Sequence, residues 1–140
     1  MTSSSQLIDF HSLRRGDALP SIRFTVTAED ARAYLEATGE ATEIWGDTVP
    51  PLALGAWTLA GLMEAMPLPP GALHGGQEFD FLGAVRHGEA VEAQLSVAQQ
   101  SERQGTNIVV FACALRCGER VVARGRTTVM APVAASEGRA

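Results

Sequence analysis

A long apolar segment in the middle of the chain limits the folds that this sequence can adopt. Residues 52–66 are apolar nearly all the way round a helix, apart from one threonine and one glutamate. Pro50 and Pro51 precede the segment and suit the first turn of a helix, where a missing amide hydrogen costs nothing. A helix that is apolar on all sides belongs in the interior of a protein. The sequence therefore predicts one long buried helix at about residues 51–66.

Two glycines lie inside this expected helix. Gly55 and Gly61 would each cost roughly 1 kcal/mol relative to alanine in a helix interior. That cost is tolerable if the glycines let the helix backbone lie close against a sheet. The run Met66-Pro67-Leu68-Pro69-Pro70-Gly71 then ends the helix.

Segments with strand character surround this helix in the sequence. After it come residues 73–82, 90–98, 107–117 and 120–130. Their short connections indicate an antiparallel sheet. Residues 108–115 are apolar on both faces, so we expect a central strand with the helix on one side and a second chain on the other. Ahead of the helix, residues 22–26 alternate as in a half-buried strand, and 27–38 form a capped helix that Gly39 ends.

The size and charge of the chain limit the number of domains and the kinds of partner that we expect. A chain of 140 residues suits one domain, which we place at 13–131, between a flexible N-terminus at 1–12 and a flexible tail at 132–140. A net charge of −5 argues against nucleic acid as a partner, because phosphate binding depends on clustered positive charge. No secretion signal or membrane-length apolar run is visible, so we expect a soluble cytoplasmic protein without a membrane partner.

Cysteine and histidine spacing bears on redox and metal chemistry. Cys113 and Cys117 would share one face of a strand ~13 Å apart, which is too far for a disulfide, so we expect reduced core residues. The three histidines and two cysteines lack the clustered spacing of a zinc site. We therefore expect no metal and no cofactor.

Three motifs in order resemble those of the MaoC-like hot dog dehydratases, in particular their fatty-acid-synthase-type branch. The run Leu73-His74-Gly75-Gly76-Gln77-Glu78-Phe79-Asp80-Phe81 resembles the His-Gly-x-Gln-x-Phe strand that follows the central helix of that family. Arg15-Gly16-Asp17 looks like its opening turn, and Arg126-Thr127-Thr128-Val129 is similar to its closing strand. The resemblance implies an α+β hot dog fold, in which an antiparallel sheet wraps around one long helix.

That family acts on hydroxyacyl and enoyl thioesters. The resemblance therefore implies a hydro-lyase that interconverts a 3-hydroxyacyl thioester of coenzyme A or acyl carrier protein and its enoyl form. Catalytic members carry the acid/base pair in a Gly-Asp-x-Asn-Pro-hydrophobic-His motif. The corresponding run here is Gly39-Glu40-Ala41-Thr42-Glu43-Ile44-Trp45, with Glu40 at the Asp position and Trp45 at the His position.

The replacement of the motif's Asp and His by Glu40 and Trp45 affects the proton transfers that the chain could catalyse. Glu40 could still act as a base, although its extra methylene moves the oxygens, and a misplacement of ~1 Å can cost on the order of 100-fold in rate. Trp45 offers only an N–H donor and cannot shuttle a proton near neutral pH. The structural alternatives are a helix-end carboxylate for Glu40 and a pocket wall for Trp45.

His74 is the remaining candidate for proton transfer. Strand alternation predicts that it shares a face with Gly76, Glu78 and Asp80, with Gln77 on the opposite, apolar face. A partner for His74 would be Glu40 or Asp47, or would come from a second subunit. A histidine satisfied structurally by neighbouring backbone is the other interpretation.

The resemblance also implies an acyl pocket between the helix, the His74 strand and a second subunit. Its expected substrate-binding residues are Trp45, Leu52, Ala53, Leu54, Gly75, Gly76, Gln77, Arg124 and Arg126. The amides around residues 52–54 would face the thioester carbonyl. Strand alternation predicts that Arg120, Arg124 and Arg126 share one face of the last strand. They form either a solvated face or a binding site for coenzyme A phosphates or an acidic carrier protein.

Two other functions remain open. The chain also resembles the non-catalytic subunits of mycobacterial hydroxyacyl carrier-protein dehydratases, whose partner supplies the Asp/His pair, so it could be an acyl-binding subunit. A hot dog thioesterase is less favoured, because only Glu64 near the far end of the helix offers a carboxylate. In each case we expect a homodimer or a heterodimer with another hot dog subunit.

Overall fold

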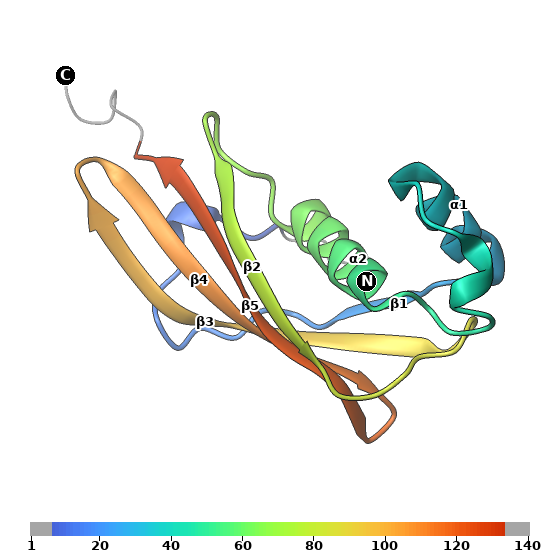
Figure 1. Ribbon diagram of the computed structural model, residues 1–140. Coiled ribbons are helices and arrows are strands. Elements are labelled where there is room, and N and C mark those ends of the chain that lie inside the picture. Colours follow the sequence, from blue (N-terminus) through green and yellow to red (C-terminus); the bar gives the residue numbers. More distant parts are fainter. Residues whose placement is uncertain (1–6, 134–140) are drawn as a thin grey trace.

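A curved antiparallel sheet packs one of its faces against a central helix in the computed structural model, which describes residues 7–133 (Figure 1). The five strands lie in the order β1-β3-β4-β5-β2. They are β1 (Ile22–Thr25), β2 (Leu73–Phe81), β3 (Ala90–Arg103), β4 (Thr106–Cys117) and β5 (Arg120–Pro132). The helices are α1 (Ala28–Thr38) and α2 (Pro51–Ala65), with short 3-10 turns η1 (Phe10–Ser12) and η2 (Thr42–Ile44). This is the expected hot dog fold.

The two glycines of α2 lie where the helix meets the sheet, as the sequence predicted. A Cβ atom on Gly55 would lie 2.5 Å from the Gln77 side chain of β2. One on Gly61 would lie 2.5 Å from Cγ2 of Ile22 in β1. The missing side chains therefore let α2 approach both edge strands of the sheet.

The prediction that α2 is buried on every side is wrong for the single chain. Ala53, Leu54 and Leu62 are buried against the sheet, but Leu52 is 65% exposed. The exposed positions continue along one stripe of the helix, with Leu52, Ala56, Ala60 and Glu64 four residues apart. One sheet covers only one side of a helix, so this largely apolar stripe remains open to solvent.

A β-bulge changes the faces that alternation predicted for β2. His74 lies opposite Val129 of β5, but Gly76 lies opposite Thr128, so Gly75 is an extra residue on β2. Val129 is buried on the helix side of the sheet. His74 therefore faces the helix side, together with Gln77, rather than the side of Gly76, Glu78 and Asp80 as expected.

A second bulge separates the three arginines of β5. Leu115 lies opposite Ala123 and Arg116 opposite Val121, so Val122 is the extra residue. Arg120 then pairs with Cys117 and turns toward the helix side. The regular alternation that placed Arg120 beside Arg124 and Arg126 ends at this bulge.

The N-terminal segment is more closely packed than the sequence suggested. Residues 1–12 were expected to be flexible, yet Phe10 is 1% exposed and Leu13 is 6% exposed. Gly16 and Leu19 donate backbone hydrogen bonds to β3. The packed domain therefore begins before residue 13, while residues 1–6 and 134–140 lie outside the described part.

The buried face of the sheet contains both cysteines. Cys113 and Cys117 are buried and free, as predicted, and burial raises the pKa of the Cys113 thiol to about 12. On β4 every second residue is buried on the helix side, whereas the residues between them are only half-buried.

Within residues 7–133 no helix is long and apolar enough to cross a membrane.

We expect Gly61→Ala to lower the free energy of unfolding by about 1–3 kcal/mol, because the new methyl group would overlap the stiff Ile22 side chain. In an Ile22→Ala background the obstructing methyl is gone. There, Gly61→Ala should stabilise the protein by up to about 1 kcal/mol through helix propensity. Urea denaturation of the four proteins measures both effects. Stabilisation by Gly61→Ala in the wild-type background would contradict the close approach.

Candidate functional site

The segment after η2 brings Trp45 to the N-terminal end of α2. Val49 donates a backbone hydrogen bond to the Val85 carbonyl at 2.7 Å, and Thr48 forms an isolated bridge with Arg86. The Arg86 guanidinium pairs with the Asp47 carboxylate at 2.6 Å. Residues 47–49 and 85–87, which are far apart in the sequence, are therefore joined side by side.

A cavity of about 330 Å³ lies beside Trp45. Its lining is mainly apolar and consists of Trp45, Thr48, Val49, Pro51, Leu54, Phe81, Leu82, Gly83, Ala84 and Val85. Small-molecule sites are commonly apolar hollows of about 300–1,000 Å³ with few polar groups. The Trp45 cavity, as we call it, lies at the low end of this range.

Trp45 contributes an unusual polar atom to this region. Its Nε1 is buried and has no hydrogen-bond partner within the described residues. A buried donor without an acceptor costs about 1–3 kcal/mol. Trp45 also borders a second, smaller hollow with Ala31, Leu35 and His87. The Trp45 side chain therefore lines both hollows.

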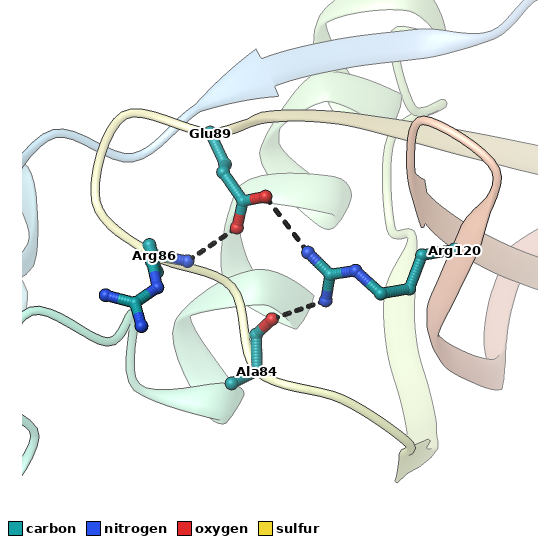
Figure 2. A network of polar contacts seen from close by, with 4 residues as sticks. All are labelled: Ala84, Arg86, Glu89 and Arg120. Atoms are coloured by element: carbon teal, nitrogen blue, oxygen red, sulfur yellow. Dashed lines mark hydrogen bonds and ion pairs between the residues drawn. The ribbon is translucent and has the colours of Figure 1, made fainter.

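A polar network supports one wall of the Trp45 cavity (Figure 2). The Glu89 carboxylate accepts hydrogen bonds from the Arg86 amide at 2.8 Å and from the Arg120 guanidinium at 2.9 Å. Arg120 also donates to the Ala84 carbonyl at 2.7 Å. The Arg86 amide and the Arg120 charge hold the pKa of the Glu89 carboxyl below its usual range, so the carboxylate is charged at neutral pH.

Glu40 lies on the surface at the end of α1. Its side chain is exposed, and its backbone amide donates to the Leu35 carbonyl at 2.9 Å. Burial, and secondarily the charge of Glu40, raises the pKa of Tyr34. Tyr34 also packs edge-on against Trp57 of α2 at a ring distance of 6.2 Å. Sequence reasoning gave Tyr34 no role at the site, although the helical spacing of Ala31, Tyr34 and Leu35 puts it on the apolar face of α1.

His74 and Glu40 are not brought together within one chain. Figure 1 shows α1 and the start of β2 on opposite sides of α2. His74 is exposed and makes no side-chain hydrogen bond with residues 7–133. Asp47, the other expected partner, is paired with Arg86 instead. Within residues 7–133, neither of the expected partners, Glu40 or Asp47, is therefore paired with His74.

The remaining expected residues divide between the two faces of the sheet. Gly75, Gly76, Gln77 and Arg126 line a hollow of about 350 Å³ at the β2 edge, together with Glu78, Val110 and Thr128. Gln77 needs no buried partner there because it is exposed. Arg124 and Arg126 lie opposite Asp80 and Glu78 and face away from α2. The sheet therefore separates both arginines from the Trp45 cavity.

The start of α2 differs from the expected carbonyl-binding site in one respect. Ala53 and Leu54 are buried, and the Ala53 amide already donates to the Pro50 carbonyl at 2.9 Å. Pro50 and Pro51 have no amide hydrogen. Leu52 is exposed, and its amide makes no backbone hydrogen bond within the described residues. At least one of the three expected donors, the Ala53 amide, is thus already used, whereas the Leu52 amide has no backbone acceptor within the described residues.

The wall formed by residues 82–85 was not anticipated from the sequence. The segment follows a strand and precedes the Arg86-His87-Gly88-Glu89 turn, and it has no motif of its own. Its position depends on hydrogen bonds to Arg120 and to the Val122 carbonyl of β5. Those contacts join positions about 40 residues apart, which no local pattern reveals.

Comparison with known proteins identifies the fold. No family model matches the sequence, and no curated protein matches it. Among solved structures, the (R)-hydratase PhaJ1 from Pseudomonas aeruginosa superposes with a TM-score of 0.71 at 18% identity, covering 89% of this chain and 86% of that one. The HadBC (3R-hydroxyacyl-ACP dehydratase) complex from Mycobacterium tuberculosis superposes with a TM-score of 0.62 at 21% identity, covering 84% of this chain and 96% of that one.

Similarity of this degree extends beyond hydratases. A mutant form of the fluoroacetyl-CoA-specific thioesterase FlK superposes with a TM-score of 0.67 at 13% identity, covering 86% of this chain and 90% of that one. The superpositions establish the fold, but sequence identities this low leave the activity open. The chain has the hot dog fold that these hydratases, dehydratase subunits and this thioesterase share.

Proposed function

We propose that this chain belongs to an acyl-thioester hydro-lyase of the MaoC type, which interconverts a 3-hydroxyacyl thioester and its enoyl form. The observation that carries the proposal is the Trp45 cavity at the start of α2. Trp45 stands at the histidine position of the motif that the sequence resembles, and the cavity is apolar enough for an acyl chain. The free Leu52 amide would be a donor for the developing enolate oxygen.

Catalysis in this proposal requires a second chain. Dehydration needs a base for the carbon next to the carbonyl and an acid for the leaving hydroxyl. The end of α1, which Glu40 follows, and the start of β2, which carries His74, lie on opposite sides of α2 in one chain (Figure 1), and Trp45 cannot transfer a proton. Either two copies combine Glu40 of one with His74 of the other, or a different hot dog subunit supplies an intact acid/base pair. The second arrangement makes this chain the acyl-binding subunit of a heteromeric dehydratase.

The edge of β2 is the surface that we propose for the second chain. Among residues 7–133, strand β2 has only one neighbour, β5, so its nine residues present an unpaired main-chain edge. Residues 73–78 are exposed throughout. Such an edge pairs readily with another strand unless charge or proline protects it. Pairing there would place His74 and Gln77 at the interface, whereas the outer sheet face carries the charges of Glu78, Asp80, Arg124 and Arg126.

The thioesterase alternative receives less support. Its sequence candidate, Glu64, is exposed near the C-terminal end of α2. It borders a hollow beside Arg23 and Trp57, at the other end of the helix from the Trp45 cavity. A carboxylate in that place would not reach a thioester whose acyl chain occupies the Trp45 cavity.

We expect the purified chain to sediment as a dimer at micromolar concentration. Single cysteines at Gly76, Gln77 and Glu78 should then identify the pairing, because directly opposed strand residues fall within disulfide range. Oxidation should link two copies through at least one of these sites. The buried native cysteines, one with a strongly raised pKa, should not interfere.

Ser101→Cys is the matched control for this cross-linking, because Ser101 is exposed on β3 away from the β2 edge. It should give no covalent dimer. A monomeric chain without cross-links would exclude the homodimer. Mixing with a hot dog subunit that carries an intact Gly-Asp-x-Asn-Pro-hydrophobic-His motif would then test the heterodimer.

Ligand binding should be visible at Trp45. In a Trp57→Phe background the fluorescence reports Trp45 alone, since the chain has two tryptophans. We expect saturating crotonyl-coenzyme A to change the emission, because an acyl chain would displace water beside the indole ring. Free coenzyme A, which lacks the acyl chain, is the control and should have a much smaller effect. An unchanged spectrum with the thioester would remove the Trp45 cavity from the proposal.

Catalytic status is tested by hydration of crotonyl-coenzyme A. If the homodimer is active, His74→Ala and Glu40→Gln should each reduce kcat by about 100- to 10,000-fold while leaving sedimentation unchanged. If the wild type is inactive alone and gains activity with an intact partner subunit, the chain is the acyl-binding subunit. Activity alone, with both variants within a few-fold of wild type, would contradict the assignment of these two residues.

A further inference from the structure

The outer wall of the Trp45 cavity is fixed at few points. The wall consists of residues 82–85, between the end of β2 and the Arg86 turn. Leu82 and Gly83 both donate to the Val122 carbonyl, at 2.8 and 3.2 Å, and the Val85 carbonyl accepts from the Val49 amide at 2.7 Å. Val122 is the bulged residue of β5. The only side chain that bonds this wall within the described residues is Arg120, through the Ala84 carbonyl.

Both terminal nitrogens of the Arg120 guanidinium donate hydrogen bonds. One nitrogen donates to the Ala84 carbonyl and another to the Glu89 carboxylate, and Glu89 in turn accepts from the Arg86 amide (Figure 2). Charge-assisted bonds of this kind are stronger than neutral ones. A planar guanidinium can serve two acceptors at a fixed angle, which a lysine ammonium does less well. The β5 bulge is what turns Arg120 toward this position.

We propose that Arg120 is a positioning residue that sets the width of the Trp45 cavity and thereby limits the length of acyl chain that the site accepts. Arg120 holds residues 82–85 against Trp45 and Leu54, which form the opposite wall. The role in chain-length selection rests on the proposed function, because it requires the acyl chain to occupy this cavity. The clamp itself does not depend on that function.

The clamp is tested without any thioester. In the Trp57→Phe background, acrylamide quenching measures how accessible Trp45 is. Arg120→Met should increase the quenching constant by about twofold, because local opening of the wall admits the quencher. Arg120→Lys should give an intermediate value. Arg103→Met is the matched control, since Arg103 is also exposed at a strand end but makes no side-chain hydrogen bond with residues 7–133. It should leave the quenching constant unchanged.

Chain-length selection is tested with crotonyl-coenzyme A and octenoyl-coenzyme A as probes. We expect Arg120→Met to shift the ratio of their dissociation constants by about tenfold in favour of the longer chain, since differences of a few methylenes are discriminated on this scale. A structural loss elsewhere would weaken both ligands equally and leave the ratio constant. Thermal unfolding of each variant monitors the fold. If Arg120→Met does not fold, Glu89→Gln and Arg120→Lys provide the same two measurements.

The outcomes separate the two proposals. Increased quenching together with a shifted ratio supports the inference. Increased quenching in a protein that binds neither probe supports the clamp and overturns the proposed function, and with it chain-length selection. Unchanged quenching in every Arg120 and Glu89 variant overturns the clamp, whatever the protein binds. Increased quenching with an unchanged ratio overturns the specificity role alone.

Discussion

The contact between α2 and the sheet determines the rest of this structure. Gly55 and Gly61 have no side chains, so the helix approaches β2 and β1 more closely than any larger residue would permit. This approach buries Leu54 and Leu62 in the core. It also fixes the start of α2 against the end of β2, where the Trp45 cavity forms. The cavity is therefore a consequence of packing at one end of the helix.

The sequence was a reliable guide to the elements and a poor guide to their faces. Apolar periodicity, the prolines and the glycines predicted α2 and the strands, and the short connections predicted antiparallel pairing, because these signals are local. The bulges at Gly75 and Val122 are set by pairing with distant strands and have no clear local signal. Each bulge moved a candidate site residue, His74 or Arg120, to the opposite face from the one that alternation predicted.

The apolar character of α2 exceeds what one chain can bury. The stripe of Leu52, Ala56 and Ala60 remains exposed, and so does the main-chain edge of β2. Exposed apolar surface and unpaired edges are both unfavourable for a protein that functions as a monomer. A partner chain of the kind that we propose would cover both features. From the sequence we expected such a partner on the outer face of the sheet and also beside the helix and the His74 strand, where it would complete the acyl pocket.

Trp45 separates two requirements that a hydro-lyase site normally combines. An acyl pocket needs apolar surface, and an indole ring supplies more of it than an imidazole. Proton transfer needs a group that titrates near neutral pH, and an indole has none. In the function that we propose, a tryptophan at the histidine position would keep the apolar surface that holds an acyl chain and would remove one means of moving a proton. Binding and catalysis would then reside on different chains, and the partner would supply the missing proton transfer.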